Sequence, residues 1–282
     1  MKRTVFAILL AAMLLVTSIA AAETTDDKIV LHAVTGGAPA PYITLDDDGN
    51  PTGYDVAVFE AVIDRLPQYE LEWTVASDGL TGLLAGLYDV SINNWAYRDE
   101  RAESYLYSYP YKLTDKVFIQ RATDAPLTSF SDVSARGYKV EVGASGPFTF
   151  ALENWNETHP DEQINFSYIQ SSGFLITYQR ILDGYTDFAV DDSPIFELTK
   201  ETYNLTDLVG NPMPEETMAE ILPSVYTYYL IRKDDWGQAF REEFDEALKS
   251  LWEDGTLLEL SKAYFAGSDV TPPASEFEYT KN

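Results

Sequence analysis

The chain has 282 residues, no cysteine and a formal net charge of −27 at pH 7. This charge argues against nucleic acid and anionic lipid as partners, because both are themselves negatively charged. Without cysteine, thiol chemistry, disulfides and cysteine-bound metal are excluded, so core burial must stabilise the fold.

The N-terminus predicts export. Met1-Lys2-Arg3 is basic, residues 4–19 are almost wholly apolar, and Ala20-Ala21-Ala22 offers small residues for cleavage before Glu23. A membrane anchor is the alternative, but the apolar run is short for a bilayer span of about 20 residues. We therefore expect residues 1–22 to be a cleaved signal peptide and the mature protein to be periplasmic or extracellular.

The first part of the chain alternates strands and helices. Apolar patterns predict strands at 30–34, 71–75 and 89–92, and helices from Asp55 to Pro67 and over 80–87. This order is typical of a parallel sheet with covering helices. The acidic stretch at 46–51 slightly resembles a calcium loop, but its spacing favours a solvated hairpin turn.

A second α/β series follows a strand at 116–120 and a segment at 122–135 that is rich in Thr, Asp, Pro and Ser. It comprises expected strands at 138–142, 164–169 and 187–190, with helices from the turn at 143–147 to Trp155 and over 175–182. A last strand at 225–231 and helices near 240–251 and 257–265 have no partners of their own, so we expect them to return to the first series.

The predicted fold is therefore α/β, with two lobes that are each a mixed sheet flanked by helices and are joined by two hinge strands. We expect residues 23–121 and 224–282 to form lobe one and residues 122–223 to form lobe two.

Enzyme motifs receive little support. Ser145 lies in Gly-Ala-Ser-Gly rather than in the Gly-x-Ser-x-Gly of a nucleophile elbow. The two histidines, His32 in a strand and His159 in a polar loop, do not suggest a metal site or a catalytic triad. We predict no metal, no cofactor and no catalytic residue.

Binding features are more informative. Arg98 and Arg101 follow one predicted strand, and Asp191 and Asp192 follow another, at the strand ends where open α/β sheets bind ligands. An arginine suits the carboxylate of a free amino acid, and an ionised aspartate suits its ammonium. Taken singly, each of these residues is more often part of a surface ion pair or a turn.

Several ordered segments together resemble a known family. They are Pro41-Tyr42, Gly53-Tyr54-Asp55-Val56, Tyr88-Asp89-Val90 with Glu100-Arg101, Tyr107-Ser108-Tyr109-Pro110-Tyr111, residues 187–194, and Asp254-Gly255-Thr256-Leu257 with Lys262-Ala263-Tyr264-Phe265. The set resembles the polar amino-acid-binding proteins of bacterial ABC transporters, the third family of extracellular solute-binding proteins. The resemblance covers nearly the whole chain after residue 22.

The resemblance implies a periplasmic-binding-protein fold and a hinged clamp that delivers an amino acid to the membrane permease of an ABC transporter. It implies that Arg101 binds the ligand carboxylate and that Asp192 binds the ammonium. Further expected contacts come from Asn94 and Ala96 on lobe one and from Ser145 and Gly146 at a helix start on lobe two. We expect Trp95 or Tyr42 to pack on the ligand side chain, and we expect a monomer.

Departures from the family pattern bear on the ligand. Ala96 stands where Ser or Thr is frequent, and Arg98 where Thr is usual. The loop at 36–39 lacks the acidic and aromatic residues that receptors for basic amino acids use, which disfavours lysine and arginine. Residues 93–95 and 155–160 resemble the cystine-type subgroup. An enzyme on the same scaffold, such as a cyclohexadienyl-dehydratase-like protein, and the sensor module of a larger receptor are the alternatives.

Overall fold

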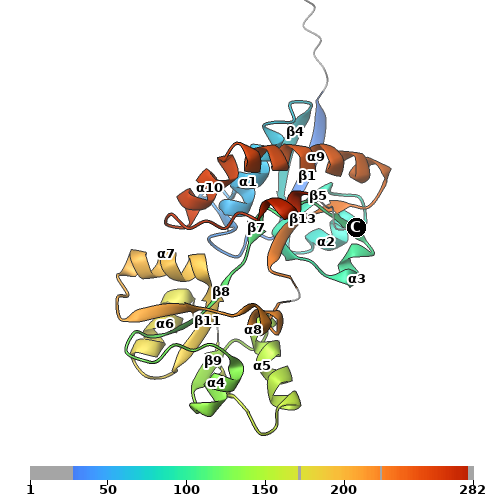
Figure 1. Cartoon of the computed structure of the whole chain (residues 1–282). Helices are drawn as coiled ribbons and strands as arrows, with labels where there is room; N and C mark the ends of the chain where they lie inside the picture. Colours follow the sequence, from blue (N-terminus) through green and yellow to red (C-terminus); the bar gives the residue numbers. More distant parts are fainter. Residues whose placement is uncertain (1–27, 171–172, 223, 279–282) are drawn as a thin grey trace, which may run out of the picture.

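The computed structural model describes residues 28–170, 173–222 and 224–278. The predicted signal peptide, residues 1–22, lies outside the described residues. Two lobes lie one above the other in Figure 1. The chain passes between them where β7 (Lys112–Leu113) leads into β8 (Lys116–Arg121) and where α8 (Glu215–Ala219) leads back to β13 (Tyr226–Arg232).

The sheet of lobe one has the strand order β4-β1-β5-β13-β6, and β7 also pairs with β13. β1 is parallel to β4 and to β5, whereas β13 is antiparallel to β5, β6 and β7. The strands are β1 (Ile29–Thr35), β4 (Tyr69–Val75), β5 (Val90–Ala96), β6 (Tyr105–Tyr107), β7 (Lys112–Leu113) and β13 (Tyr226–Arg232). The last strand of the chain thus returns to lobe one, as the sequence predicts.

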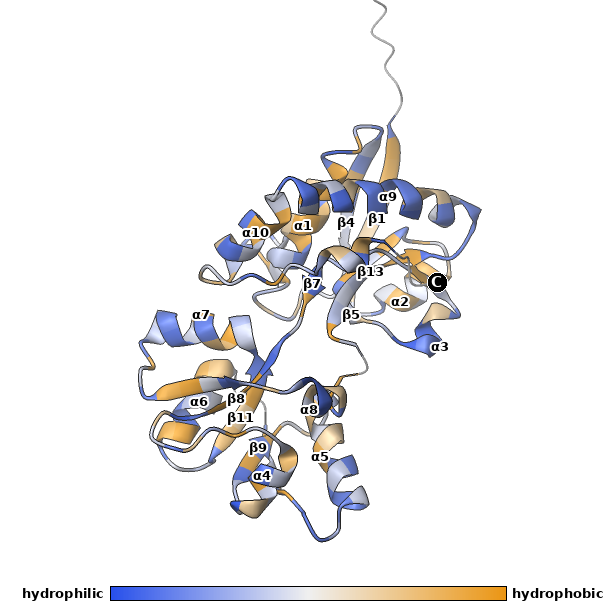
Figure 2. Ribbon diagram, viewed as in Figure 1, coloured by the Kyte–Doolittle hydropathy of each residue, from blue (hydrophilic) through white to orange (hydrophobic). Residues whose placement is uncertain are grey.

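The helices of lobe one cover this sheet because their apolar residues recur at helical spacing. They are α1 (Tyr54–Ile63), α2 (Gly79–Leu84), α3 (Asp99–Ala102), α9 (Asp235–Glu253), α10 (Thr256–Tyr264) and the short 3-10 helix Ala274–Phe277. Phe59 of α1 meets Phe244 of α9 and Tyr229 of β13, with ring centroids 5.4 and 5.2 Å apart. Figure 2 shows that α9 carries many hydrophilic residues, whereas its buried residues include Phe240, Phe244 and Leu248.

The acidic stretch at 46–51 is a hairpin turn, as predicted. It joins β2 (Thr44–Leu45) to β3 (Pro51–Thr52), which are antiparallel. The Asp46 carboxylate accepts hydrogen bonds from the backbone N–H groups of Asp48 and Asn50, so it closes the turn itself.

Lobe two contains a three-stranded antiparallel sheet, β11-β8-β12, and a parallel pair, β9 and β10. Its strands are β8 (Lys116–Arg121), β9 (Lys139–Val142), β10 (Asn165–Tyr168), β11 (Phe188–Asp192) and β12 (Leu208–Pro212). Its helices are α4 (Phe130–Ala135), α5 (Pro147–Thr158), α6 (Phe174–Leu182), α7 (Ser193–Tyr203) and α8 (Glu215–Ala219).

The strand at 116–121 corrects the expected lobe boundary. We expected it in lobe one, but β8 is the central strand of the lobe-two sheet, where Phe118 lies opposite Val190 and Asn211. Phe118 is fully buried in a lobe-two core that also contains Phe130 of α4, so the strand at 116–121 belongs to the same lobe as the segment that follows it. The first connection therefore lies near Thr114, whose N–H donates to the carbonyl of Val225 in the second connection at 2.6 Å.

Candidate functional site

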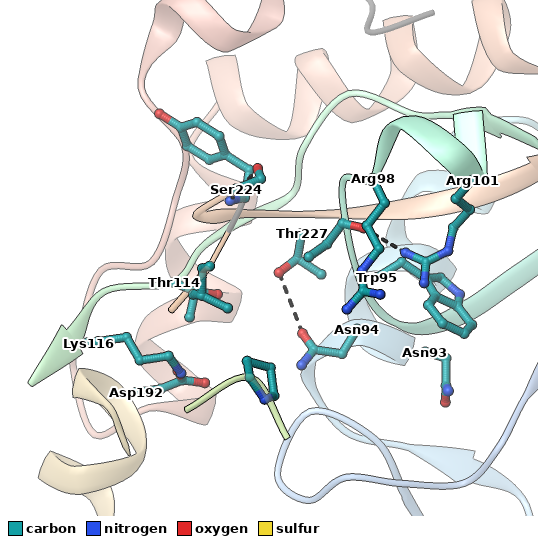
Figure 3. A pocket seen from close by; sticks show the side chains of 14 residues that line it. Asn93, Asn94, Trp95, Arg98, Arg101, Thr114, Lys116, Asp192, Ser224 and Thr227 are labelled. Atoms are coloured by element: carbon teal, nitrogen blue, oxygen red, sulfur yellow. Dashed lines mark hydrogen bonds and ion pairs between the residues drawn. The ribbon is translucent and has the colours of Figure 1, made fainter. Parts of the chain in front are cut away.

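A pocket of about 290 Å³ lies between the lobes, at the two connections. Its lining includes Arg101 from lobe one, Asp192 from lobe two, and Thr114 and Ser224 from the connections. In Figure 3 the two arginines and Trp95 lie on one side of this pocket, and Lys116 and Asp192 lie on the other. The pocket thus has a lobe-one wall and a lobe-two wall.

The lobe-one wall is built by the end of β5 and by α3. Arg101 donates a hydrogen bond to the carbonyl of Ala96 at 2.8 Å, and its guanidinium lies over the ring of Trp95 at 4.6 Å. These two contacts hold the planar guanidinium at the pocket, which suits it to a carboxylate. Arg98 also lines the pocket, and its side chain is exposed. Among the described residues, none forms a hydrogen bond or an ion pair with the Arg98 guanidinium.

Asn94 contributes to the same wall with an unusual backbone. Its φ of 54° lies in the left-handed region, where asparagine is tolerated better than most residues. Its side-chain oxygen accepts a hydrogen bond from Lys112 at 2.5 Å. Lys112 is itself buried and lies 3.6 Å from the buried carboxylate of Asp55, so Asn94 is tied to an ion pair inside lobe one.

The lobe-two wall is centred on Asp192, which is 8% exposed. Asp192 begins α7 as its N-cap residue, but its side chain does not cap the helix. Instead it accepts hydrogen bonds from Lys116 and from Tyr42, both at 2.5 Å. Burial disfavours the Asp192 carboxylate, but Lys116, Tyr42 and the more distant Lys112 outweigh it and lower the pKa of Asp192.

The pairing of Lys116 with Asp192 follows from the sheet. The two residues are directly opposite one another in the antiparallel ladder between β8 and β11, so their side chains share one face. The register therefore fixes this ion pair. The sequence marks Lys116 as part of a strand but not as a neighbour of Asp192, because strand register is a tertiary property.

Tyr42 lies beside the pocket rather than in its lining. Of the two residues expected to pack on a ligand side chain, Trp95 lines the pocket, whereas Tyr42 is only 3% exposed and lies outside the lining. Its ring lies beneath the ammonium of Lys112, 3.2 Å from the centroid, and beside Phe265. Its hydroxyl instead reaches from lobe one to Asp192 on lobe two, so Tyr42 links the lobes.

Ser145 and Gly146 also lie outside this pocket. They line a neighbouring hollow of about 340 Å³ on lobe two, together with Asp191 at the end of β11. Pro147, the first residue of α5, lines both spaces, so the two adjoin. Of the expected contact residues, the structure brings Arg101, Asp192, Asn94, Ala96 and Trp95 together in one pocket, and it leaves Tyr42, Ser145 and Gly146 beside it.

Neither a metal centre nor a membrane span is found in the part of the chain that the structure describes. Within residues 28–170, 173–222 and 224–278, no three His, Asp or Glu side chains are grouped so that they could hold a metal ion. Over the same ranges, no helix combines the length and the apolar character needed to cross a membrane.

The fold and the pocket agree with a match to a family model. Residues 31–267 match the model of bacterial extracellular solute-binding proteins, family 3, and the chain belongs to this family.

Individual proteins of the same kind are also similar to this chain. The chain is 28% identical over 251 residues to the probable amino-acid-binding protein YxeM of Bacillus subtilis, with 87% of each chain covered. It is 26% identical over 256 residues to the L-cystine-binding protein TcyJ of the same organism, covering 89% of this chain and 90% of the relative. The L-cystine solute receptor of Neisseria gonorrhoeae, in its unliganded open conformation, has a similar fold, with a TM-score of 0.66 and 22% identity over 88% of this chain and 97% of that one.

Proposed function

We propose that the mature protein captures a free amino acid outside the cytoplasm and delivers it, chemically unchanged, to the membrane permease of an ABC importer. The observation that carries this proposal is the pocket between the lobes, where Arg101 and Asp192 lie on opposite walls. Membership of the solute-binding family and the amino-acid- and cystine-binding relatives support it.

The arrangement suits a clamp that closes on its ligand. A solute that contacts Arg101 on one lobe and the lobe-two wall on the other favours the conformation in which both contacts form. The carbonyl of Ala96 already holds one nitrogen of the Arg101 guanidinium, which leaves its other N–H groups for a carboxylate. Trp95 offers an apolar and aromatic surface beside the same group.

The cellular setting belongs to the same proposal. The basic and apolar pattern of residues 1–22 supports export by a cleaved signal peptide. We propose a periplasmic or extracellular monomer whose partners are the amino acid and the permease, with no nucleic acid and no cofactor.

A thermal-shift screen of the mature protein against the common amino acids and L-cystine tests this proposal. A ligand that binds the folded state raises the melting temperature, by an amount that grows with its saturation. We expect at least one amino acid to raise it and to be recovered unchanged after incubation. The absence of any shift across the panel would contradict the amino-acid assignment.

The enzyme alternative makes a different prediction. In a cyclohexadienyl-dehydratase-like protein the added compound would be converted, so a product would accumulate over time in the same samples. The structure places neither histidine in the pocket: His159 stacks on Trp155 in lobe two, and His32 lies 3.4 Å from Glu72 in lobe one. The relatives named for amino-acid and L-cystine binding favour the receptor, and we retain binding as the proposed function.

A further inference from the structure

The charges that line the inter-lobe pocket differ in sign from those of the whole chain. The full sequence has a formal charge of −27, yet the pocket is lined by the cations of Arg98, Arg101 and Lys116 and by one carboxylate, that of Asp192. Together these side chains leave two positive charges facing a small space. The net negative charge of the protein repels anions at long range. A cluster of cations in the pocket between the lobes counteracts this repulsion locally and attracts anions to the pocket.

The single carboxylate is already neutralised from within the protein. The Lys116 ammonium lies 2.5 Å from one Asp192 oxygen, and the Tyr42 hydroxyl donates to the other at the same distance. Because β8 and β11 hold Lys116 opposite Asp192, this pair is part of the sheet. An ammonium on the ligand would therefore meet an aspartate whose charge is balanced and whose two oxygens are both engaged.

The lobe-one wall is not balanced in this way. Arg101 contacts a carbonyl oxygen and an aromatic ring, neither of which carries a negative charge. No ion pair joins Arg98 to an acidic side chain among the described residues, and Figure 3 places both guanidiniums on the side of the pocket opposite Asp192. Two guanidiniums can each bind a carboxylate through paired hydrogen bonds.

Asp191, the neighbouring carboxyl, does not offset this charge within the pocket. It lines the adjoining hollow, where Tyr178 donates to it at 2.9 Å. Burial, followed by the charge of Asp192, raises the pKa of Asp191 to about 7, so it is only partly ionised at neutral pH.

From these contacts we infer that the ligand of this pocket is a small solute with at least two carboxylates and net negative charge, and that a free ammonium is not required. This inference rests on the proposed function as a receptor, and it names the solute class. The Lys116 ammonium occupies the position at Asp192 that a ligand ammonium would otherwise take. Arg98 supplies a second contact for an anionic group beside Arg101.

Isothermal titration calorimetry on the mature chain tests the inference with three matched probes. Glutarate carries two carboxylates and no ammonium, L-glutamate carries two carboxylates and one ammonium, and L-glutamine carries one of each. We expect glutarate and L-glutamate to bind at least about tenfold more tightly than L-glutamine. Tighter binding of L-glutamine or of L-cystine than of glutarate would overturn the inference while leaving the proposed amino-acid receptor intact.

Substitutions test which positively charged residue binds the second carboxylate. Arg98→Gln should weaken glutarate binding by about tenfold and change L-glutamine binding by no more than about twofold. Lys262→Gln removes an equal charge from the exposed face of α10 and should leave both affinities unchanged. Equal effects of Arg98→Gln and Lys262→Gln would overturn the role of Arg98.

Lys116→Gln frees one oxygen of Asp192 for a ligand ammonium, so this variant should bind L-glutamate more tightly than glutarate, whereas the wild type should bind the two about equally. If Lys116→Gln does not fold, Lys116→Arg keeps the charge and should still bind both probes about equally. A Lys116→Gln variant that still binds glutarate as tightly as L-glutamate would overturn the replacement of the ligand ammonium. Glutarate binding without binding of any amino acid would support this inference and contradict the amino-acid part of the proposed function.

Discussion

The two walls of the inter-lobe pocket hold their charges in different ways. On the lobe-two wall, the Asp192 carboxylate has a cation and a phenol bound to its two oxygens, and the sheet register fixes the cation. On the lobe-one wall, Arg101 is positioned by a carbonyl and an aromatic ring without being neutralised. In the receptor that we propose, lobe one would provide the anion contacts, while lobe two would present a carboxylate whose two oxygens are already hydrogen-bonded within the protein.

Replacing Arg101 should produce the largest loss of ligand affinity, because it removes a cation of the lobe-one wall that no acidic side chain neutralises. Losing one partner of a buried charge pair costs about 2–5 kcal/mol, so Arg101→Ala should weaken ligand binding by tens to thousands of fold. Calorimetry with the best ligand of the screen measures this loss, and far-ultraviolet circular dichroism controls for folding. A near-normal affinity would contradict the assignment of the anion contact to lobe one.

Disrupting the lobe-two wall should act mainly on stability. Lys116→Gln leaves the Asp192 carboxylate with a weaker partner, and because both side chains are only slightly exposed we expect a loss of about 1–3 kcal/mol in the free energy of unfolding. Urea denaturation measures it. The double variant with Asp192→Asn should recover part of the loss, and strict additivity of the two changes would show that the pair is not coupled.

The contact between the walls can be tested with Tyr42→Phe. This variant removes the hydrogen bond from lobe one to Asp192, so we expect a loss of about 1 kcal/mol and a more open distribution of lobe separations in solution scattering. Tyr105→Phe is a matched control, because its hydroxyl donates to the carbonyl of Leu80 within lobe one. Equal openness of the two variants would contradict the interlobe role of Tyr42.

The smallest expected effect is a pH dependence of the free energy of unfolding, caused by Asp191 in lobe two. Burial and Asp192 raise the pKa of Asp191 from 3.8 to about 7, so the folded state binds more protons than the unfolded state between these values. The wild type should therefore lose stability relative to Asp191→Asn as the pH rises from about 4 to about 7, with a constant difference above that range. Urea denaturation of both proteins across this range measures the difference, and a constant difference throughout would contradict the raised pKa.

Much of the fold could be predicted because its signals are local. Val58, Phe59 and Val62 recur at helical spacing and are buried on α1, and Phe240 and Phe244 are buried in the same way on α9. In contrast, the sequence pattern does not predict α7, because an aspartate before Ser193-Pro194 is typical of a turn as well as of a helix cap. Pro194 stands in the first turn of the helix, where its missing N–H is tolerated, and Ile195 and Phe196 become buried.

The site shows the same division between local and tertiary information. Arg101 and Asp192 could be proposed because each follows a strand end, and the structure places both at one pocket. The position of Tyr42 could not be read in the same way, because its burial depends on Lys112, which is 70 residues away in the chain and lies over its ring. Lys116 was recognised as part of a strand, but its partner depends on which strand lies beside it.

Trp95 gives the pocket an optical property of its own. Of the five tryptophans in the sequence, all of which the structure describes, Trp95 is the one in the pocket lining, where a guanidinium covers its indole. The other four pack elsewhere, for example Trp236 against Phe240 and Trp155 against His159. A solute that engages Arg101 will change the electric field on the Trp95 indole, so the intrinsic fluorescence of the unlabelled protein should report occupancy directly, and the signal should disappear in Trp95→Phe.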